Sequence, residues 1–301
     1  MATAYASRVI EAPVEHVWAT VRDFNGLPTW HPALKSSQIE DGRPADAVGC
    51  IRHLVLQNGA STRERLLELD DAGYRLSYAF ETPLFPVKNY LATITLIPLT
   101  AADHTFVQWQ GSFEEAPEDA GKYSAIISKD VYAEGLAALA RFLSAKTRPA
   151  ALPERWAGAR PAKAYAAAVI RKPLEDVWAR LRDFAALDRL HPDIKDSRME
   201  GGARSEQVGA IRRFRLGPAE ATEQLTALSD VEHRLSYRML QGPQPWLAYR
   251  ASVRLYPVSA TNETVAVWQG DWTAAPHDDL SLIPGIAQGV YQRIFDTLNA
   301  G

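Results

Sequence analysis

The sequence predicts an α+β protein of two tandem domains, each a curved antiparallel sheet wrapped around a long C-terminal helix. The first supporting observation is an internal repeat. A shift of 160 positions aligns residues 4–24 with 164–184, and a shift of 159 continues the match past a one-residue gap. The second is the order of expected elements in each copy: a strand, two short helices, a series of strands and a long helix. The period is that of a whole domain. Strands with one apolar face need a cover, and the terminal helix can supply it.

Each element follows from a local pattern. Apolar runs at 5–10 and 165–170 predict the opening strands. Pro13 and Pro173 stand where a helix can begin, and the apolar residues after them recur at helical spacing. A second short helix should stop at the histidine before a proline in each copy, and turn signals then separate the strands. Amphipathic helices are expected to end the copies at about 122–144 and 283–298.

Length, charge and composition narrow the class of protein. The 301 residues suit two domains, expected at 1–147 and 163–301 with a proline-rich linker at 148–162. The net charge of −3, with both signs interspersed, predicts no binding of nucleic acid or anionic lipid. No signal-peptide pattern and no apolar run of membrane-spanning length occur, so a cytoplasmic protein is expected.

The motifs of several cofactor enzymes are missing from the sequence. It holds no glycine-rich phosphate loop, no CxxC pair and no HExxH, which argues against a nucleotide, zinc or haem enzyme. We therefore expect no cofactor and no metal. The sequence leaves open whether the two copies contact each other or the chain forms a homodimer.

An arginine, a glutamate and a tyrosine are expected on the covered face of the sheet in each copy. Side chains alternate along a strand, so Arg52 shares its face with Leu54 and Leu56. The same alternation places on this face Glu64, Tyr78, Tyr90 and Trp109 in the first copy, and Arg212, Glu223, Tyr237, Tyr249 and Trp268 in the second. Burying an unpaired charge is costly, so the arginine and glutamate need each other, a ligand, or water in a cavity. An apolar cavity with a few convergent polar groups is typical of a small-molecule site.

Two plainer interpretations stay open. The charged pairs could be buried ion pairs that fix strand register, with Tyr90 and Tyr249 as ordinary core residues. If one of these strands were a solvent-exposed edge strand, its charged side chain would not be buried and would need no partner.

The shared motifs resemble those of a known family. AxVIxxPxxxVWxxxRDF, HPxxKxS, VGxIR, the glutamate strand ExL, RLSY, PxxxY and WQG resemble the polyketide cyclase/dehydrase branch of the START-like (SRPBCC) superfamily, whose members share the helix-grip fold. The VGxIR, Glu and Tyr elements are also similar to those of lachrymatory factor synthase and, more distantly, of the abscisic acid receptors. The resemblance implies an arginine, a glutamate and a tyrosine that handle an oxyanion and a proton in a cavity. By motif these catalytic residues are Arg52, Glu64 and Tyr90, and in the second copy Arg212, Glu223 and Tyr249.

Some assignments depend on finer points. Glu68 lies on the same expected strand face as Glu64, but the second copy has Ala227 there, which favours Glu64. The match at Tyr90 depends on how 81–87 aligns with 240–246. The residues expected to contact a substrate are Trp30, His31, Tyr78, Phe85 and Trp109 in the first copy, and His191, Tyr237, Trp246 and Trp268 in the second.

The two copies are not equivalent at every such position. Trp30 becomes Leu190 and Phe85 becomes Gln244, which predicts two cavities of unequal selectivity. For the paired histidines we favour a ring that caps the backbone at a helix end, with acid or base catalysis as the alternative.

The leading functional hypothesis is a cofactor-independent enzyme that cyclises, dehydrates or isomerises a small, mostly apolar, oxygenated molecule of the polyketide type. The arginine would stabilise an oxyanion, the glutamate would move a proton and the tyrosine would donate to a substrate oxygen. The alternatives are a non-catalytic binding or transport protein for a small hydrophobic ligand, and a co-chaperone or other interaction module.

Burial raises a carboxylate pKa and a nearby arginine lowers it, and the sequence leaves the balance open. Because all three polar residues persist in both copies, both cavities are expected to be competent.

Overall fold

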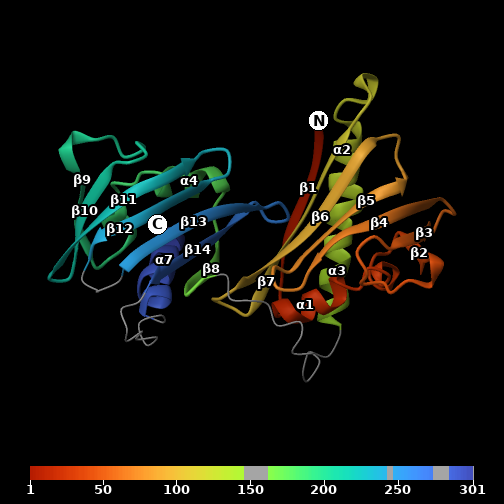
Figure 1. Cartoon of the computed structure of the whole chain (residues 1–301), viewed down its shortest axis with the longest axis horizontal. Helices are drawn as coiled ribbons and strands as arrows, with labels where there is room; N and C mark the ends of the chain where they lie inside the picture. Colours follow the sequence, from red (N-terminus) through yellow and green to blue (C-terminus); the bar gives the residue numbers. More distant parts are fainter. Residues whose placement is uncertain (146–161, 243–246, 274–284, 301) are drawn as a thin grey trace. The chain divides into compact units, whose positions relative to one another are not determined.

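The computed structural model describes residues 1–145, 162–242, 247–273 and 285–300, which form two compact units (Figure 1). Each unit is one seven-stranded antiparallel sheet with a terminal helix packed on one face. The predicted fold class of two tandem α+β domains is therefore confirmed. The linker expected at 148–162 lies outside the described residues except for Ala162.

The first unit has the predicted order of elements. Its sheet runs β1-β7-β6-β5-β4-β3-β2, so the first and last strands are neighbours. The elements are β1 (Ala2–Ile10), α1 (Val14–Val21), the 3₁₀ helix η1 (Leu27–Thr29), β2 (Leu34–Ile39), the 3₁₀ turn η2 (Glu40–Gly42), β3 (Ile51–Leu56), β4 (Ser61–Asp70), β5 (Arg75–Thr82), β6 (Lys88–Leu99), β7 (His104–Glu114), the 3₁₀ turn η3 (Pro117–Asp119) and the terminal helix.

The second unit repeats this topology with the sheet order β8-β14-β13-β12-β11-β10-β9. Its elements are β8 (Ala164–Ile170), α4 (Leu174–Leu181), α5 (Leu187–Leu190), β9 (Ile194–Met199), the 3₁₀ turn η6 (Glu200–Gly202), β10 (Ile211–Leu216), β11 (Ala219–Ser229), β12 (Arg234–Gln241), β13 (Leu247–Val258), β14 (Glu263–Thr273) and the terminal helix.

The terminal helices contain a segment that the sequence pattern did not predict. In the first unit α2 (Lys122–Ile126) leads into the π-helix η4 (Ile127–Ala133) and then into α3 (Glu134–Ser144). In the second unit the π-helix η7 (Ala287–Gln292) leads into α7 (Arg293–Ala300), and the expected start at 283 lies outside the described residues. π segments are rare and are frequently found at functional sites.

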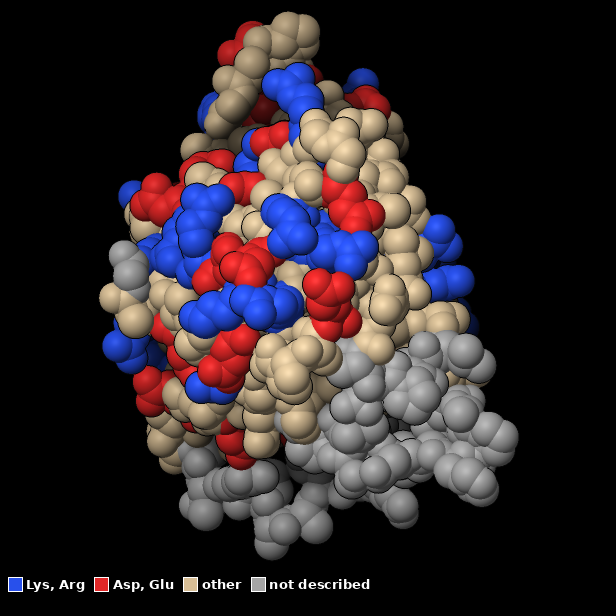
Figure 2. All heavy atoms as spheres, turned by 90° about the vertical axis from the view of Figure 1, so that its left-hand side faces the viewer, with Lys and Arg blue, Asp and Glu red and all other residues tan. Residues whose placement is uncertain are grey.

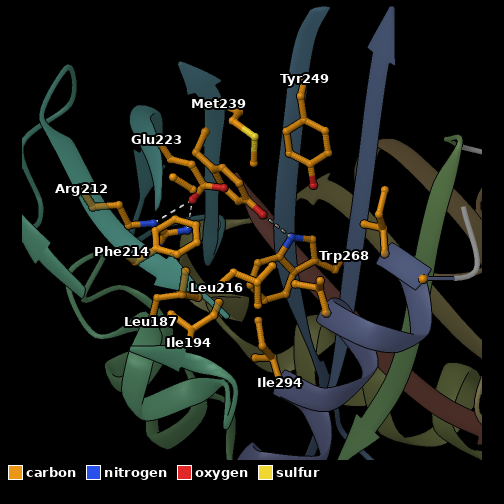
Figure 3. A pocket seen from close by; sticks show the side chains of 15 residues that line it. Leu187, Ile194, Arg212, Phe214, Leu216, Glu223, Met239, Tyr249, Trp268 and Ile294 are labelled. Carbon is orange, nitrogen blue, oxygen red and sulfur yellow. Dashed lines mark hydrogen bonds and ion pairs between the residues drawn. The ribbon is translucent and has the colours of Figure 1, made fainter. Parts of the chain in front are cut away.

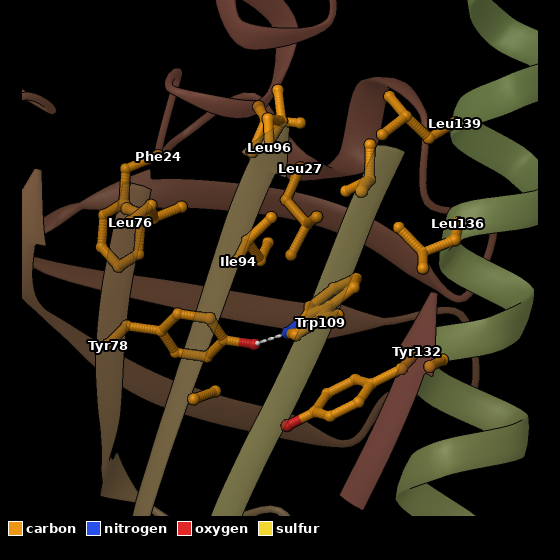
Figure 4. Close-up of a cluster of buried hydrophobic side chains, with 14 of the residues drawn as sticks. Phe24, Leu27, Leu76, Tyr78, Ile94, Leu96, Trp109, Tyr132, Leu136 and Leu139 are labelled. Carbon is orange, nitrogen blue, oxygen red and sulfur yellow. Dashed lines mark hydrogen bonds between the residues drawn. The ribbon is translucent and has the colours of Figure 1, made fainter. Parts of the chain in front are cut away.

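The core lies between the sheet and the terminal helix. Figure 4 shows Leu76, Ile94 and Trp109 pointing from their strands toward Leu136 and Leu139 of the helix. The terminal helix therefore covers the apolar face of the sheet, as predicted. The same arrangement recurs in the second unit.

The shared VWxxxRDF motif fixes the first helix to the sheet. The indole nitrogen of Trp18 and the Nε of Arg22 both donate to Asp71 Oδ1 at 2.8 Å. In the second copy Trp178 and Arg182 bind Asp230 in the same way. One turn aspartate thus anchors α1 or α4 over the end of the sheet.

The charged surface is of mixed sign, as the composition predicted. Figure 2 shows basic and acidic side chains interspersed on the face in view. Ion pairs of the second unit such as Arg213–Glu200 at 2.6 Å and Arg234–Glu232 at 3.1 Å account for part of this mixture. Among the described residues no helix combines the length and apolar character needed to cross a membrane.

Candidate functional site

The buried arginine of the first unit is paired with the buried glutamate. Arg52 on β3 and Glu64 on β4 are direct cross-strand partners. Nε and Nη2 of the arginine lie 2.8 and 2.6 Å from Glu64 Oε2, and Nη1 donates to the carbonyl of Phe24 at 2.5 Å. The guanidinium carbon also lies 3.9 Å from the centre of the Phe24 ring. Three sides of the guanidinium are therefore occupied by the protein itself.

The second unit reproduces this arrangement. Nε and Nη2 of Arg212 donate to Glu223 Oε2 at 2.8 and 2.5 Å, and Nη1 donates to the carbonyl of Phe184 at 3.0 Å. In both units the arginine contacts only one of the two carboxylate oxygens of the glutamate, Oε2. Within the described parts of the chain, Oε1 of Glu64 and of Glu223 accepts no hydrogen bond, and both glutamates line a cavity.

A group of aromatic hydroxyls lies beside each glutamate. The hydroxyl oxygens of Tyr90 and Tyr132 are 2.6 Å apart, and the indole N–H of Trp109 donates to the hydroxyl of Tyr78 at 3.1 Å (Figure 4). The second unit repeats both contacts, Tyr249 with Tyr291 at 2.5 Å and Trp268 with Tyr237 at 3.1 Å. In the first unit the three tyrosines carry three hydroxyl protons, and the hydrogen bonds of Tyr90 with Tyr132 and with Tyr78 use two of them. One hydroxyl proton thus remains for a ligand oxygen.

The helix tyrosines were missed by the sequence-based interpretation. Tyr132 and Tyr291 lie in the π segments of the terminal helices. The sequence held a signal, because Val131-Tyr132 and Val290-Tyr291 match at the shift of 159 that also aligns the RLSY and WQG motifs. Alternation along a strand says nothing about residues in a helix, so it could not identify Tyr132 or Tyr291.

Burial sets the protonation of these groups. It raises the pKa of Tyr78, Tyr90 and Tyr132, and likewise of Tyr237, Tyr249 and Tyr291. The six hydroxyls therefore stay protonated near neutral pH and can donate hydrogen bonds. Burial also raises the pKa of Glu223, although the pairing with Arg212 lowers it.

Each unit holds a cavity between the sheet and the terminal helix, and the two differ in size. The cavity of the first unit has a volume of about 80 Å³ and that of the second about 280 Å³ (Figure 3). The polar groups of the second cavity gather at one end, where Glu223 and Tyr249 point inward (Figure 3). Much of the remaining wall is leucine, isoleucine, valine, phenylalanine and methionine. A polar end within an apolar wall suits a mostly apolar ligand that carries oxygen atoms at one end.

The structure brings most of the expected site residues to these cavities. The first is lined by His31, Glu64, Tyr78, Phe85, Tyr90 and Trp109, and the second by Arg212, Glu223, Tyr237, Tyr249 and Trp268. Among the described residues, Arg52 lies behind Glu64, and Trp30 packs against His31 and Trp109 rather than lining the cavity. Trp246 lies outside the described residues.

Glu68, the other acidic candidate, is placed elsewhere. The register of β4 and β5 shifts between Leu66 and Glu68, which turns Glu68 to the outer face of the sheet. There it accepts hydrogen bonds from Arg75 and Ser77. The bulge leaves Glu64 as the glutamate of the first cavity.

The two shared histidines bind the π segments. His31 Nδ1 accepts from the backbone N–H of Ala33 at 3.4 Å, so Nε2 carries the proton and donates to the carbonyl of Val131 at 3.2 Å. His191 binds the carbonyl of Gly289 at 2.9 Å and is buried, but it is not among the described residues that line the second cavity. Burial lowers the pKa of both rings. Neutral rings that bind helix carbonyls have the geometry of backbone caps.

The glycine of the shared WQG motif makes room for the helix tyrosine. A Cβ added at Gly111 would overlap the hydroxyl oxygen of Tyr132, and one at Gly270 would overlap that of Tyr291. We expect Gly111→Ala to destabilise the protein by about 1–3 kcal/mol, as other overpacking substitutions do. With Tyr132→Phe the nearest remaining ring atom would be 3.4 Å from the new Cβ. Urea unfolding of the four variants of this cycle should show a much smaller effect of Gly111→Ala in the phenylalanine background. Equal losses in the two backgrounds would contradict the steric account.

One family of known proteins matches both copies of the repeat. A family model described as polyketide cyclase/dehydrase and lipid transport matches residues 1–143 and again residues 161–300. The abscisic acid receptor PYL7 of Arabidopsis thaliana is 29% identical over 99 residues, a match that covers 32% of this chain and 46% of the receptor, about half its length.

Two solved structures illustrate similarity to one unit and to the whole chain. The protein XoxI of Bacillus cereus is 30% identical, with 48% of this chain and 97% of that chain covered and a TM-score of 0.44. The di-domain ARO/CYC BexL of the BE-7585A biosynthetic pathway is 13% identical, with 100% and 98% covered and a TM-score of 0.43. Because the family model matches both copies over nearly their whole length, the chain belongs to the polyketide cyclase/dehydrase and lipid transport family and carries its domain twice.

Proposed function

We propose that the chain is a cofactor-independent cyclase, dehydratase or isomerase whose substrate is a small, mostly apolar, oxygenated, polyketide-like molecule. The observation that carries the proposal is the free oxygen of a buried glutamate facing an apolar cavity beside tyrosine hydroxyls, repeated in both units. A carboxylate so placed can take a proton from a carbon next to a carbonyl and return it elsewhere. Loss of that proton is the first step of many cyclisations, dehydrations and isomerisations of polyketide-like molecules.

In the first unit the contacts favour a division of roles in which Arg52 does not touch the substrate. Arg212 makes the same contacts in the second unit but also lines its cavity. Arg52 already donates to Glu64 and to the Phe24 carbonyl, which makes it a positioning residue for the carboxylate. Glu64 Oε1 then moves the proton. A tyrosine hydroxyl donates to the substrate oxygen on which negative charge develops, in a cavity where little water competes.

The apolar walls assist by holding a flexible substrate in one shape. Ring closure brings two parts of one molecule together, and a cavity that fits only the folded chain lowers the entropic part of the barrier. A carrier would use the same walls for affinity alone. Proton transfer therefore separates the two functions.

The simplest test uses benzoylacetone, an apolar 1,3-diketone with an acidic C–H, as a probe. Binding is followed by quenching of tryptophan fluorescence, and exchange of the C–H for deuterium by proton NMR in D₂O. The proposed enzyme binds the probe and accelerates exchange well beyond buffer. Saturable binding with exchange at the buffer rate would identify a carrier.

The acid limb of the pH profile is a further expected outcome. Since burial raises the pKa of Glu223 above the ordinary 4.5, a glutamate base in the second unit becomes active only as pH rises through that raised value. The Glu64→Gln variant isolates the second unit, and its exchange rate should show an acid limb above pH 4.5. The free energy of unfolding depends on pH in the opposite direction. The raised pKa of Glu223 contributes fully to stability below the pKa of the unfolded state, and this contribution is lost as pH rises through the pKa of the folded state. An acid limb at or below pH 4.5 would contradict the dominance of burial.

A further inference from the structure

One position faces the glutamate directly and differs between the two units. Phe80 on β5 is the cross-strand partner of Glu64, and Met239 on β12 is the cross-strand partner of Glu223. Both side chains line their cavities, on the wall next to the carboxylate. Figure 3 shows the sulfur of Met239 between Glu223 and Tyr249. A ligand whose oxygen meets the tyrosine must lie against this side chain.

The ring of Phe80 occupies space at the wall of the first cavity and is held there by Tyr90. Its ring stacks on the ring of Tyr90 with centroids 4.0 Å apart and planes at 18°. Stacking of this kind holds an aromatic ring beyond what burial alone contributes. Methionine is unbranched and flexible, so Met239 can move aside for a ligand.

The other differences between the described walls act in both directions. Leu54 is replaced by Phe214 and Gly135 by Ile294, and both larger residues line the larger cavity. On the helix side, Ile126 is replaced by Gly285, which lines the second cavity, and Asp130, which lines the first, is replaced by Gly289. Thr62 is replaced by Ala221, a change of two side-chain atoms. Phe80 to Met239 is the substitution, among lining positions described in both units, that removes a rigid ring.

We propose that this position sets ligand size, so that the second unit binds the bulky body of an aromatic or two-ring ketone and the first unit accepts only a small ligand. The inference rests on the proposed function in one respect, that the cavity is the substrate site. It goes further by assigning unequal ligands to the two units and by naming the residue responsible.

The test is a fluorescence titration of the full chain with prodan, a naphthyl ketone whose emission shifts to the blue when it is buried. Wild type is expected to bind one equivalent. Met239→Phe should weaken that binding at least about tenfold, the usual cost of overpacking. Phe80→Met should add a second equivalent. Leu240→Phe is the matched control, because Leu240 is the next residue of the strand and is exposed, and it should leave the titration unchanged.

Two results would overturn the assignment. One is wild type binding two equivalents of equal affinity, and the other is an unchanged stoichiometry in Phe80→Met. Thermal unfolding of each variant shows whether it folds, and Phe80→Met keeps the test decisive if Met239→Phe does not. Because the titration measures binding and not turnover, failure of benzoylacetone exchange with the prodan pattern intact would reject the enzyme and retain the size assignment.

Discussion

Exchange of benzoylacetone is expected to fall by about 10²- to 10⁴-fold when both Glu64→Gln and Glu223→Gln are introduced, the usual contribution of a positioned acid or base. Glutamine keeps the size of the side chain and an oxygen that can accept from the arginine, but it cannot take a proton. The quenching titration should therefore give nearly the same affinity for wild type and the double variant. Of the single variants, Glu223→Gln should have the larger effect, because the second cavity has the larger volume.

Glu68→Gln is the matched control for these variants. Glu68 lies on the neighbouring part of β4 but binds Arg75 and Ser77 on the outer face, so its exchange rate should equal that of wild type. An unchanged rate in the double Glu64/Glu223 variant would remove the proposed proton carrier. A parallel loss of probe binding would instead show that the glutamates hold the ligand.

Arg212→Met is expected to destabilise the second unit by about 3–5 kcal/mol, because it leaves Glu223 buried without its partner. Arg212 and Glu223 each have only 5% of their side chains exposed. The charge left behind would be neutralised by uptake of a proton, since loss of the arginine removes the group that lowers the pKa of Glu223. The lost stability should therefore return in part as the pH is lowered. Urea unfolding at several pH values measures both effects.

The double variant Arg212→Met/Glu223→Leu provides the control for that loss. Replacing a whole buried ion pair by apolar residues of similar volume is often neutral or stabilising, so most of the lost stability should be recovered. A loss below about 1 kcal/mol in the single variant, the range of exposed pairs, would mean that water reaches the pair.

The fold and the charged pair could be predicted because both follow from simple periodicities. Alternation along a strand put Arg52 and Glu64 on one face, and the structure places them opposite each other in adjacent strands. Comparison of the two copies separated Glu64 from Glu68 where alternation could not. The physical reason is the β-bulge after Leu66, which breaks the two-residue period and turns Glu68 outward.

Other parts of the site depend on features that no strand pattern contains. Tyr132 reaches Tyr90 from a π segment, where the helical period changes locally. The effect that we propose for Phe80 and Met239 on ligand size depends on how each side chain packs, and side-chain packing of this kind is not encoded in periodicity. The oxyanion-stabilising role expected for the arginine also could not be checked from strand faces. In the structure Arg52 binds Glu64 and the Phe24 carbonyl, which makes it a positioning residue for the carboxylate.

A structure of the chain with benzoylacetone bound tests the central proposal most directly. We predict that the diketone lies in the second cavity with one oxygen within hydrogen-bond distance, about 2.6–3.2 Å, of a tyrosine hydroxyl and with its acidic carbon facing Glu223 Oε1. Its phenyl ring should lie against the apolar wall beside Met239. A reversed pose, with the phenyl ring against the tyrosines and the diketone at the apolar end, would contradict the assignment of Glu223 as the proton carrier.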